Sequence, residues 1–306
     1  TYIGSTGTQT AALGFGGYLG PFTNATEEYD GSGWATGGNL NTAKQLQAGF
    51  GITTAAVSAG GDISPGNISE VEEYDGSSWT EVTNVPAAIA GGGGAGILTA
   101  GLIAGGVGDP ALAESYEYDG TNWSAEADLN TARANSGMAG TQTAAIHFGG
   151  QTAPGDPTFS AASESYNGSA WTAESAMNTA RSVLAGSGTG TSALGSGGAI
   201  VPGAVSNLTE SWDGSSWTAS STLGTARERL AGAGASALSG LAFGGTTGSY
   251  TAVTEEYNNS FEVVTAGAWA SSGAIPTAVN GQIGAGSASA GLAALGHSTT
   301  AAQVTT

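Results

Sequence analysis

The chain has 306 residues and a formal net charge of −19, because 24 acidic side chains face only five Lys and Arg. Such an acidic chain excludes a general nucleic-acid-binding role, which needs a basic surface, and an anionic membrane would repel it. Cysteine is absent, which excludes disulfides, thiolate nucleophiles and thiolate metal sites. No apolar run approaches the roughly 18 residues of a membrane-spanning helix, so we expect no membrane insertion.

One short phrase returns along the whole chain. An aromatic residue, Asp-Gly or Asn-Gly and a Trp five residues after the aromatic recur at intervals of 44 to 48 residues. The aromatic and Trp pairs are Tyr29 and Trp34, Tyr74 and Trp79, Tyr118 and Trp123, Tyr166 and Trp171, and Trp212 and Trp217, with a worn copy at Tyr257 to Phe261. A fixed period of this size indicates a propeller, a solenoid or an array.

Each repeat contains four short β-type runs separated by turn residues. In the repeat around 133–175, the runs cover 134–140, 144–148 and 163–166, and the fourth begins at Trp171. The turn Asn167-Gly168 between the last two runs is a strong hairpin signal. A double glycine ends the second run of each repeat, at Gly16-Gly17, Gly60-Gly61, Gly105-Gly106, Gly149-Gly150, Gly197-Gly198 and Gly244-Gly245, with a decayed copy at Gly296-His297.

Four antiparallel strands in about 45 residues match one blade of a propeller. We therefore expect a single all-β propeller domain over 1–306, with seven blades at about 1–40, 41–84, 85–128, 129–176, 177–222, 223–274 and 275–306. In the sixth repeat, the fourth β-type run is expected near Trp269. The seventh blade is expected to lack its fourth strand. Its third strand would need a partner, either a segment beyond Thr306 or a neighbouring copy that adds a strand. The small residues of the seven first runs should line a central channel.

The double glycine, the Tyr about twelve residues later, the Trp and an Arg-bearing link together resemble the kelch repeat. Phrases such as Leu129-Asn130-Thr131-Ala132-Arg133 are similar to Ala/Gly/Thr/Ser-rich kelch-type repeats in structural proteins of bacteriophages and environmental bacteria. The Tyr-to-Trp distance is shorter than in kelch repeats, and Gly and Ala stand where kelch strands carry bulky apolar residues. The resemblance implies a kelch-like propeller without a catalytic set, used in a virion, a fibre or a cell surface.

Four of the five basic residues share one position in the repeat, and only Arg229 is off this register. Lys44, Arg133, Arg181 and Arg227 each stand just before the first run of a repeat, and Glu27, Glu72, Glu164 and Glu210 recur in the third run. This register predicts ion pairs between blades, or hydrogen bonds to carbonyls of a neighbouring loop. The alternative is a ligand-binding cluster of arginines.

Residues that could perform catalysis are sparse. His147 lies in an apolar run without a second metal ligand at usable spacing, so we predict no metal, no cofactor and no catalytic residue. The Asp-Gly-Ser-Ser-Trp turn resembles the Asp box of sialidases but is one residue short, and a glycoside hydrolase stays a remote alternative. Asp30, Asp75, Asp119 and Asp213 are expected to cap their own turns, since calcium needs more ligands than one carboxylate.

The loops between the second and third runs vary most in length and hold most of the prolines. They also carry Tyr18, Phe22, Phe159 and Tyr250, which form a candidate ligand face. Candidate glycosylation acceptors are Asn24, Asn67, Asn122, Asn167, Asn207 and Asn258.

The sequence predicts a non-enzymatic structural or assembly protein, located in an extracellular fibre or a virion. Its expected partners are copies of itself or other structural subunits. The alternative is a carbohydrate- or receptor-binding adhesin module, whose variable-loop face would contact cell-surface glycans.

Overall fold

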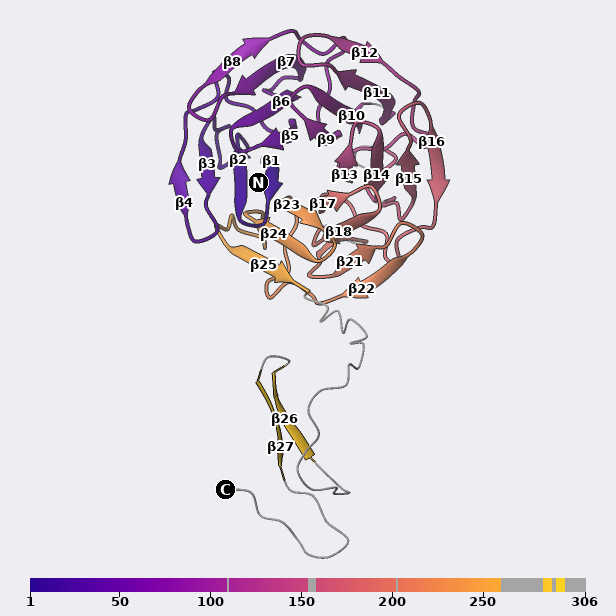
Figure 1. Ribbon diagram of the computed structural model, residues 1–306. Helices are drawn as coiled ribbons and strands as arrows, with labels where there is room; N and C mark the ends of the chain where they lie inside the picture. Colours follow the sequence, from indigo (N-terminus) through magenta and orange to yellow (C-terminus); the bar gives the residue numbers. More distant parts are fainter. Residues whose placement is uncertain (109, 154–157, 202, 260–282, 288–289, 295–306) are drawn as a thin grey trace, which may run out of the picture. The chain divides into compact units, whose positions relative to one another are not determined.

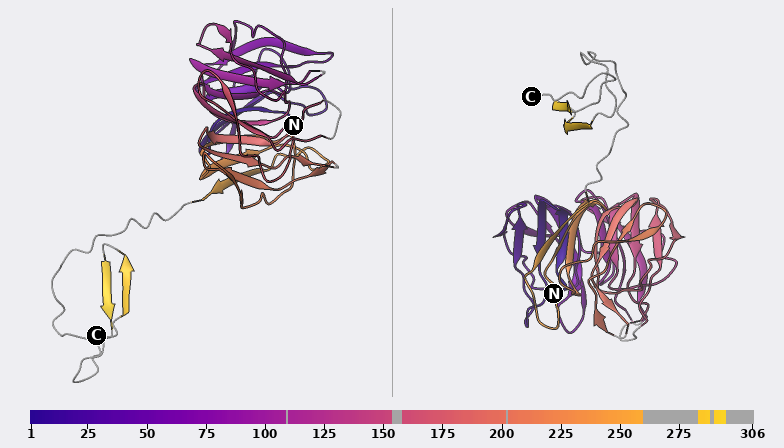
Figure 2. Two further views of the ribbon diagram at one scale, coloured as in Figure 1. Left: turned by 90° about the vertical axis from the view of Figure 1, so that its right-hand side faces the viewer. Right: turned by 90° about the horizontal axis from the view of Figure 1, so that it is seen from below.

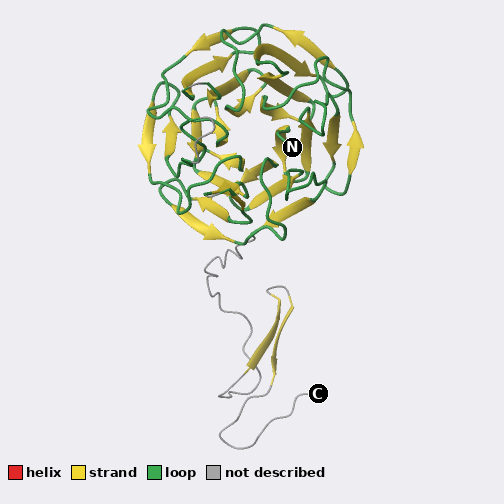
Figure 3. Cartoon of the chain, turned by 180° about the vertical axis from the view of Figure 1, so that it is seen from behind, coloured by secondary structure: helices red, strands yellow, loops and turns green. Residues whose placement is uncertain are grey.

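The computed structural model describes residues 1–108, 110–153, 158–201, 203–259, 283–287 and 290–294. The chain divides into two compact units, Thr1–Ser260 and Phe261–Thr306. Strands and loops make up the described part (Figure 3), in which no helix is long and apolar enough to cross a membrane.

The first unit is a propeller of six antiparallel sheets, or blades, arranged in a ring (Figure 1). Blade 1 contains β1 (Gly4–Thr8), β2 (Ala11–Phe15), β3 (Thr26–Tyr29) and β4 (Trp34–Thr36). Blade 2 contains β5 (Ala48–Ile52), β6 (Ala55–Asp62), β7 (Asn67–Tyr74) and β8 (Trp79–Val82). Blade 3 contains β9 (Gly93–Ile97), β10 (Ala100–Gly106), β11 (Leu112–Tyr118) and β12 (Trp123–Ala125).

The remaining blades follow the same order from the centre of the ring outward. Blade 4 contains β13 (Gly137–Thr141), β14 (Ala144–Phe148), β15 (Ser163–Tyr166) and β16 (Trp171–Glu174). Blade 5 contains β17 (Ala185–Thr189), β18 (Ser192–Ser196), β21 (Thr209–Trp212) and β22 (Trp217–Ser220), with a small hairpin of β19 (Ala199–Ile200) and β20 (Ala204–Val205) in its loop. The described part of blade 6 has three strands, β23 (Ala231–Ser236), β24 (Ser239–Phe243) and β25 (Thr254–Asn258). The second unit contains one described hairpin, β26 (Ile283–Ser287) with β27 (Ala290–Ala294).

The outer hairpin of each blade explains the five-residue spacing of the repeated phrase. Tyr74 pairs directly with Trp79 across the turn, and their ring centroids lie 5.0 Å apart. In the turn, Oδ1 of Asp75 accepts the backbone N–H groups of Ser77 and Ser78, both at 2.8 Å. Gly76 has a φ of 91°, which glycine adopts without strain. The hydrogen bond from the Ser77 hydroxyl, together with these two backbone hydrogen bonds, lowers the pKa of Asp75 to about 2.

A closed circle of backbone hydrogen bonds runs around the axis at one end of the central channel. One residue per blade donates its N–H to the carbonyl of its counterpart in the preceding blade, and all six have a positive φ: Tyr2, Leu46, Gly91, Asn135, Val183 and Arg229. The circle closes where Tyr2 donates to the carbonyl of Arg229, at 3.2 Å. Six blades therefore complete the ring.

The expectation of seven blades is wrong for this ring. Blade 1 lies directly beside blade 6, because the Tyr29 hydroxyl donates to Glu256 at 2.7 Å and Nε1 of Trp34 donates to the Thr254 hydroxyl at 2.9 Å. Counting repeats does not determine the angle between neighbouring sheets, and that angle sets the number of blades. The expected fourth run near Trp269 and the expected third strand of the seventh repeat lie outside the described residues.

Small residues let the innermost strands converge. The six first strands line the channel, and a Cβ atom on Gly49 would lie 2.6 Å from the carbonyl oxygen of Ser5. Further out, aromatic and aliphatic side chains fill the spaces between blades, as where Leu13, Phe15, Leu40 and Trp79 pack together. Seen from the side, the sheets stand around the ring with loops at both faces (Figure 2).

The circle of positive-φ residues generates a stability prediction. Val183 has a φ of 49°, a region that disfavours β-branched side chains. We expect Val183→Gly to raise the free energy of unfolding by about 0.5–1 kcal/mol, measured by urea denaturation. Gly91→Val at the equivalent position is the matched control and should destabilise the protein, since its Cβ would meet Oδ1 of Asn135 at 2.8 Å. Destabilisation by Val183→Gly would contradict the argument.

Candidate functional site

The chain between two blades lies in a slot between them, which we call the linker slot. In the slot between blades 1 and 2, the N–H of Leu40 donates to the carbonyl of Asn24 at 2.9 Å. The N–H groups of Asn41 and Thr42 then donate to the carboxylate of Glu72, at 2.6 and 3.5 Å. This buried carboxylate also pairs with Nζ of Lys44 at 3.1 Å. One Glu thus satisfies two backbone donors and one cation.

The same arrangement recurs around the ring. The ion pairs are Arg133 with Glu164 at 2.8 Å, Arg181 with Glu210 at 3.1 Å, and Arg227 with Glu255 at 2.9 Å. All three guanidinium groups are 0 % exposed. Burial lowers their pKa values, while the partner carboxylates oppose the shift.

The expected geometry of these pairs needs one correction. Each cation belongs to a linker and pairs with the third strand of the blade that the linker enters, so the ion pair does not join strands of two blades. The link to the preceding blade is made by the backbone, as where the N–H of Arg133 donates to the carbonyl of Leu112 at 3.1 Å. Glu255 completes the series, and Glu27 pairs with none of the described cations.

Blade 3 replaces the ion pair with apolar residues. Ile89 stands at the position of the cation and Tyr116 at that of the Glu, and both side chains are buried in one cluster. Pro86 stands at the position of Asn41 and has no N–H to donate. The carboxylate is therefore absent where its main backbone donor is also absent.

A second set of contacts joins adjacent blades and was not anticipated from the sequence. Tyrosine hydroxyls of one blade donate to a Glu of the preceding blade: Tyr74 to Glu28 at 2.5 Å, Tyr118 to Glu73 at 2.6 Å, Tyr166 to Glu117 at 2.9 Å and Tyr29 to Glu256 at 2.7 Å. Burial and the Glu28 carboxylate raise the pKa of Tyr74 to about 12. The sequence did contain a signal for these contacts, because each of these Glu residues stands directly before the repeated Tyr of its own blade.

His147 is buried between blades 3 and 4. Its Nε2 lies 2.7 Å from the Ser136 hydroxyl, and burial together with the nearby Arg133 holds its pKa well below the usual value. Among the described residues, no group of three or more His, Asp or Glu side chains is placed to hold a metal ion. His147 is thus a neutral packed imidazole.

The candidate ligand face is only partly assembled. Tyr18 contacts Phe22 and Tyr250, with ring centroids 5.5 and 6.3 Å apart, and Tyr250 is 52 % exposed. Phe159 belongs to the loop of blade 4, where it bridges to Gln151, and none of the described aromatic contacts connects it to the other three.

Next to this aromatic cluster lies a cavity of about 370 Å³ between blades 6 and 1, which we call the blade 6–1 groove. Its lining is mainly apolar and includes Tyr18, Leu19, Trp34 and Phe243, with Glu27 as its one ionisable carboxyl group. The groove is within the size range of small-ligand pockets, about 300–1,000 Å³. It is the candidate functional site.

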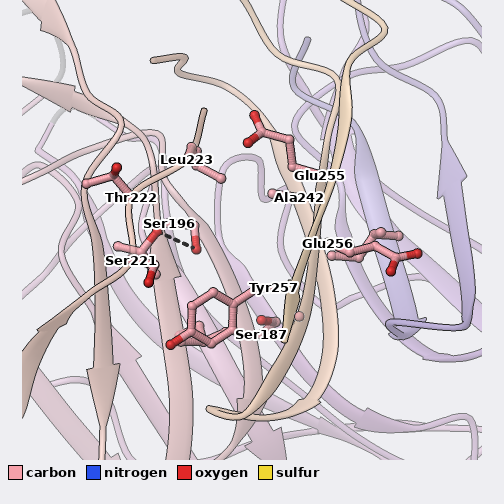
Figure 4. A pocket seen from close by; sticks show the side chains of 13 residues that line it. Ser187, Ser196, Ser221, Thr222, Leu223, Ala242, Glu255, Glu256 and Tyr257 are labelled. Atoms are coloured by element: carbon pink, nitrogen blue, oxygen red, sulfur yellow. Dashed lines mark hydrogen bonds between the residues drawn. The ribbon is translucent and has the colours of Figure 1, made fainter. Parts of the chain in front are cut away.

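A second cavity, between blades 5 and 6, is much smaller. It has a volume of about 50 Å³ and is lined by Ser187, Ser196, Glu255 and Tyr257 among others (Figure 4). One water needs about 10–15 Å³ on this measure, so the space fits a few water molecules. The cavity is too small for an organic ligand.

The candidate glycosylation acceptors fall into two groups. Nδ2 of Asn24, Asn67 and Asn207 donates to the carbonyls of Leu40, Val107 and Leu223 respectively, and a glycan on that atom would disrupt these contacts. Asn122, Asn167 and Asn258 are exposed in or beside the outer turns. The second group alone presents accessible acceptors.

The sequence matches no protein-family model, and no curated protein matches it. The structure shows an all-β, six-bladed propeller with antiparallel blades, of which five are four-stranded and the sixth has three described strands. Propellers serve many unrelated functions, so the function has to be argued from the site.

The buried ion pairs generate a prediction about stability. Arg181→Ala should lower the free energy of unfolding by about 3–5 kcal/mol, because it leaves Glu210 buried without its cation. Arg229→Ala is the control: Arg229 is 40 % exposed and pairs with its neighbour Glu228, so a loss below about 1 kcal/mol is expected. Transplanting the blade 3 set, Asn178→Pro with Arg181→Ile and Glu210→Tyr, should recover much of the loss. Equal effects of the two single substitutions would refute this account.

His147 generates a prediction about pH. Its pKa is lowered in the folded protein, so the unfolded state binds a proton first as the pH falls below about 6.5. The free energy of unfolding should therefore decrease between pH 6.5 and 5, by at most about 1.4 kcal/mol per pH unit. His147→Phe should flatten this slope in urea denaturation series. An unchanged slope in the variant would assign the pH dependence to other groups.

Proposed function

We propose that the chain is a non-catalytic assembly protein built from kelch-type repeats, working in an extracellular fibre or a phage virion. The observation that carries the proposal is the use of its cations. Four of the five basic side chains, Lys44, Arg133, Arg181 and Arg227, are fully buried in linker slots. They hold the scaffold together and line neither of the two cavities found between described blades, whereas an enzyme or an anion-binding protein directs such groups toward its ligand.

The exposed surface fits a protein that assembles through short-range contacts. Arg229 is the one basic side chain that reaches the surface, so the exterior is almost purely anionic. Exposed apolar side chains lie at the first hairpins of blades 2, 3 and 6: Ile52, Ile97 and Leu238. Others lie in the loops between second and third strands: Leu19, Val201 and Tyr250. Apolar side chains thus occur on two sets of loops, both available to neighbours.

A carbohydrate-binding module is the second candidate. The contacts among Tyr18, Phe22 and Tyr250 favour it, because exposed aromatic rings beside a cavity offer the flat apolar surfaces that sugars stack on. In that case Tyr250→Ala would abolish glycan binding and leave self-association unchanged.

Self-association should increase with the salt concentration. Net charge of this size makes copies repel one another, and salt screens the repulsion over about 10 Å at 0.1 M. Sedimentation velocity should therefore detect larger species at about 0.5 M NaCl than at about 0.01 M, and electron microscopy should show regular contacts between rings. A monomer at every salt concentration, combined with Tyr250-dependent glycan binding, would favour the adhesin over the assembly protein.

A further inference from the structure

We infer that the blade 6–1 groove binds an extended peptide segment from another chain that carries this protein's own linker motif. The motif is an aliphatic residue, two residues with free backbone N–H groups, a small residue and a cation, as in Leu129-Asn130-Thr131-Ala132-Arg133. The inference rests on the proposed assembly function for its biological role, and it names the chemistry of the partner. The other linker slots of the ring supply the physical argument.

Five slots show what such a site holds. Each contains the buried first residue of a linker: Leu40, Val85, Leu129, Met177 and Leu223. Leu40 packs against Phe15 of blade 1 and Trp79 of blade 2. The residues at the same positions around the groove are Phe243 of blade 6 and Trp34 of blade 1, and both line its cavity. The groove therefore has the walls of an aliphatic pocket.

The exposure of the walls agrees with this comparison. Trp79, Trp171 and Trp217 are buried beside Leu40, Leu129 and Met177, whereas Trp34 stays partly exposed, as does Trp123 beside the smaller Val85. No linker covers Trp34 among the described residues. An aliphatic side chain placed as Leu40 is would remove apolar surface of both Trp34 and Phe243 from water, which favours binding.

Glu27 supplies the polar half of the site. It stands in the third strand at the position of Glu72, Glu164, Glu210 and Glu255, each of which accepts two backbone N–H groups and pairs with a cation. The Glu27 carboxylate is exposed, and none of the described residues donates a hydrogen bond to it or pairs with it. It lines the groove beside the apolar walls. An incoming segment of the linker type would offer all three partners.

The edge of the groove matches the backbone of a linker as well. In the filled slot, the carbonyl of Asn24 accepts the N–H of Leu40. Ala252 occupies the equivalent place in blade 6 and lines the groove. A bound segment could therefore bridge blade 6 through its first N–H and blade 1 through the next two. The anionic exterior favours the approach of its cation.

The test is a binding titration with a labelled peptide of sequence Leu-Asn-Thr-Ala-Arg, followed by fluorescence anisotropy on the full chain. We expect saturable binding that Glu27→Gln weakens by about tenfold, since the substitution removes a charge-assisted pair. Glu81→Gln is the matched control, because Glu81 is an exposed carboxylate on β8 outside the groove. Both variants should melt within about 1 °C of the parent, because exposed substitutions change stability little.

Peptide variants separate the contributions of the motif. Asp in place of Leu should abolish binding, and Glu in place of Arg should weaken it. The peptide Ile-Pro-Thr-Ala-Val, the sequence of residues 275–279, should bind more weakly, because Pro lacks the N–H and Val lacks the charge.

Absence of saturable binding, or equal effects of Glu27→Gln and Glu81→Gln, would overturn the inference. The proposed function fails separately: a chain that binds the peptide but stays monomeric at every salt concentration would support the site and reject assembly. A chain that associates in sedimentation velocity but does not bind the peptide would support assembly and reject the site.

Discussion

The structure depends on a carboxylate that accepts the first backbone N–H groups of the linker in four of the five described linker slots. Glu72, Glu164 and Glu210 each accept hydrogen bonds from two backbone N–H groups in a slot between blades. Each also forms an ion pair with one cation. Without the carboxylate, the linker would bury donors that nothing accepts, and without the cation the carboxylate would be a buried charge. The linker also bonds back to the blade it leaves, so one residue set holds two blades at a defined spacing.

The linkers also position the innermost strands around the axis. Each linker delivers a residue with positive φ to the circle of backbone hydrogen bonds, and each first strand follows directly. Gly and Ala dominate these strands because the backbones of neighbouring blades approach within van der Waals distance. The high content of Gly and Ala, which resembles low complexity, therefore meets a packing requirement near the axis. Further out, Tyr and Trp fill the wider spaces between blades.

The blade 6–1 groove departs from this regularity. Five slots hold a described linker, whereas the blade 6–1 groove combines the same walls with an exposed Glu27 and a partly exposed Trp34. The aromatic cluster of Tyr18, Phe22 and Tyr250 lies beside it. The lining of the groove thus combines apolar walls with one carboxylate, and on this combination we base the inference that it binds a polypeptide segment.

The sequence by itself determined the blade. The five-residue spacing of Tyr and Trp, the Asp-Gly turns and the double glycines act over a few residues, so the outer hairpins, the Asp caps and the propeller architecture were predictable. The shared register of the cations and Glu residues likewise indicated ion pairs. Only the tertiary structure decided that six blades close the ring, because closure depends on the angle between sheets and on contacts such as Tyr2 with Arg229 that span the chain. It also decided which blade each ion pair belongs to, and it separated Phe159 from the other loop aromatics. These outcomes depend on packing between distant segments, which a local pattern does not encode.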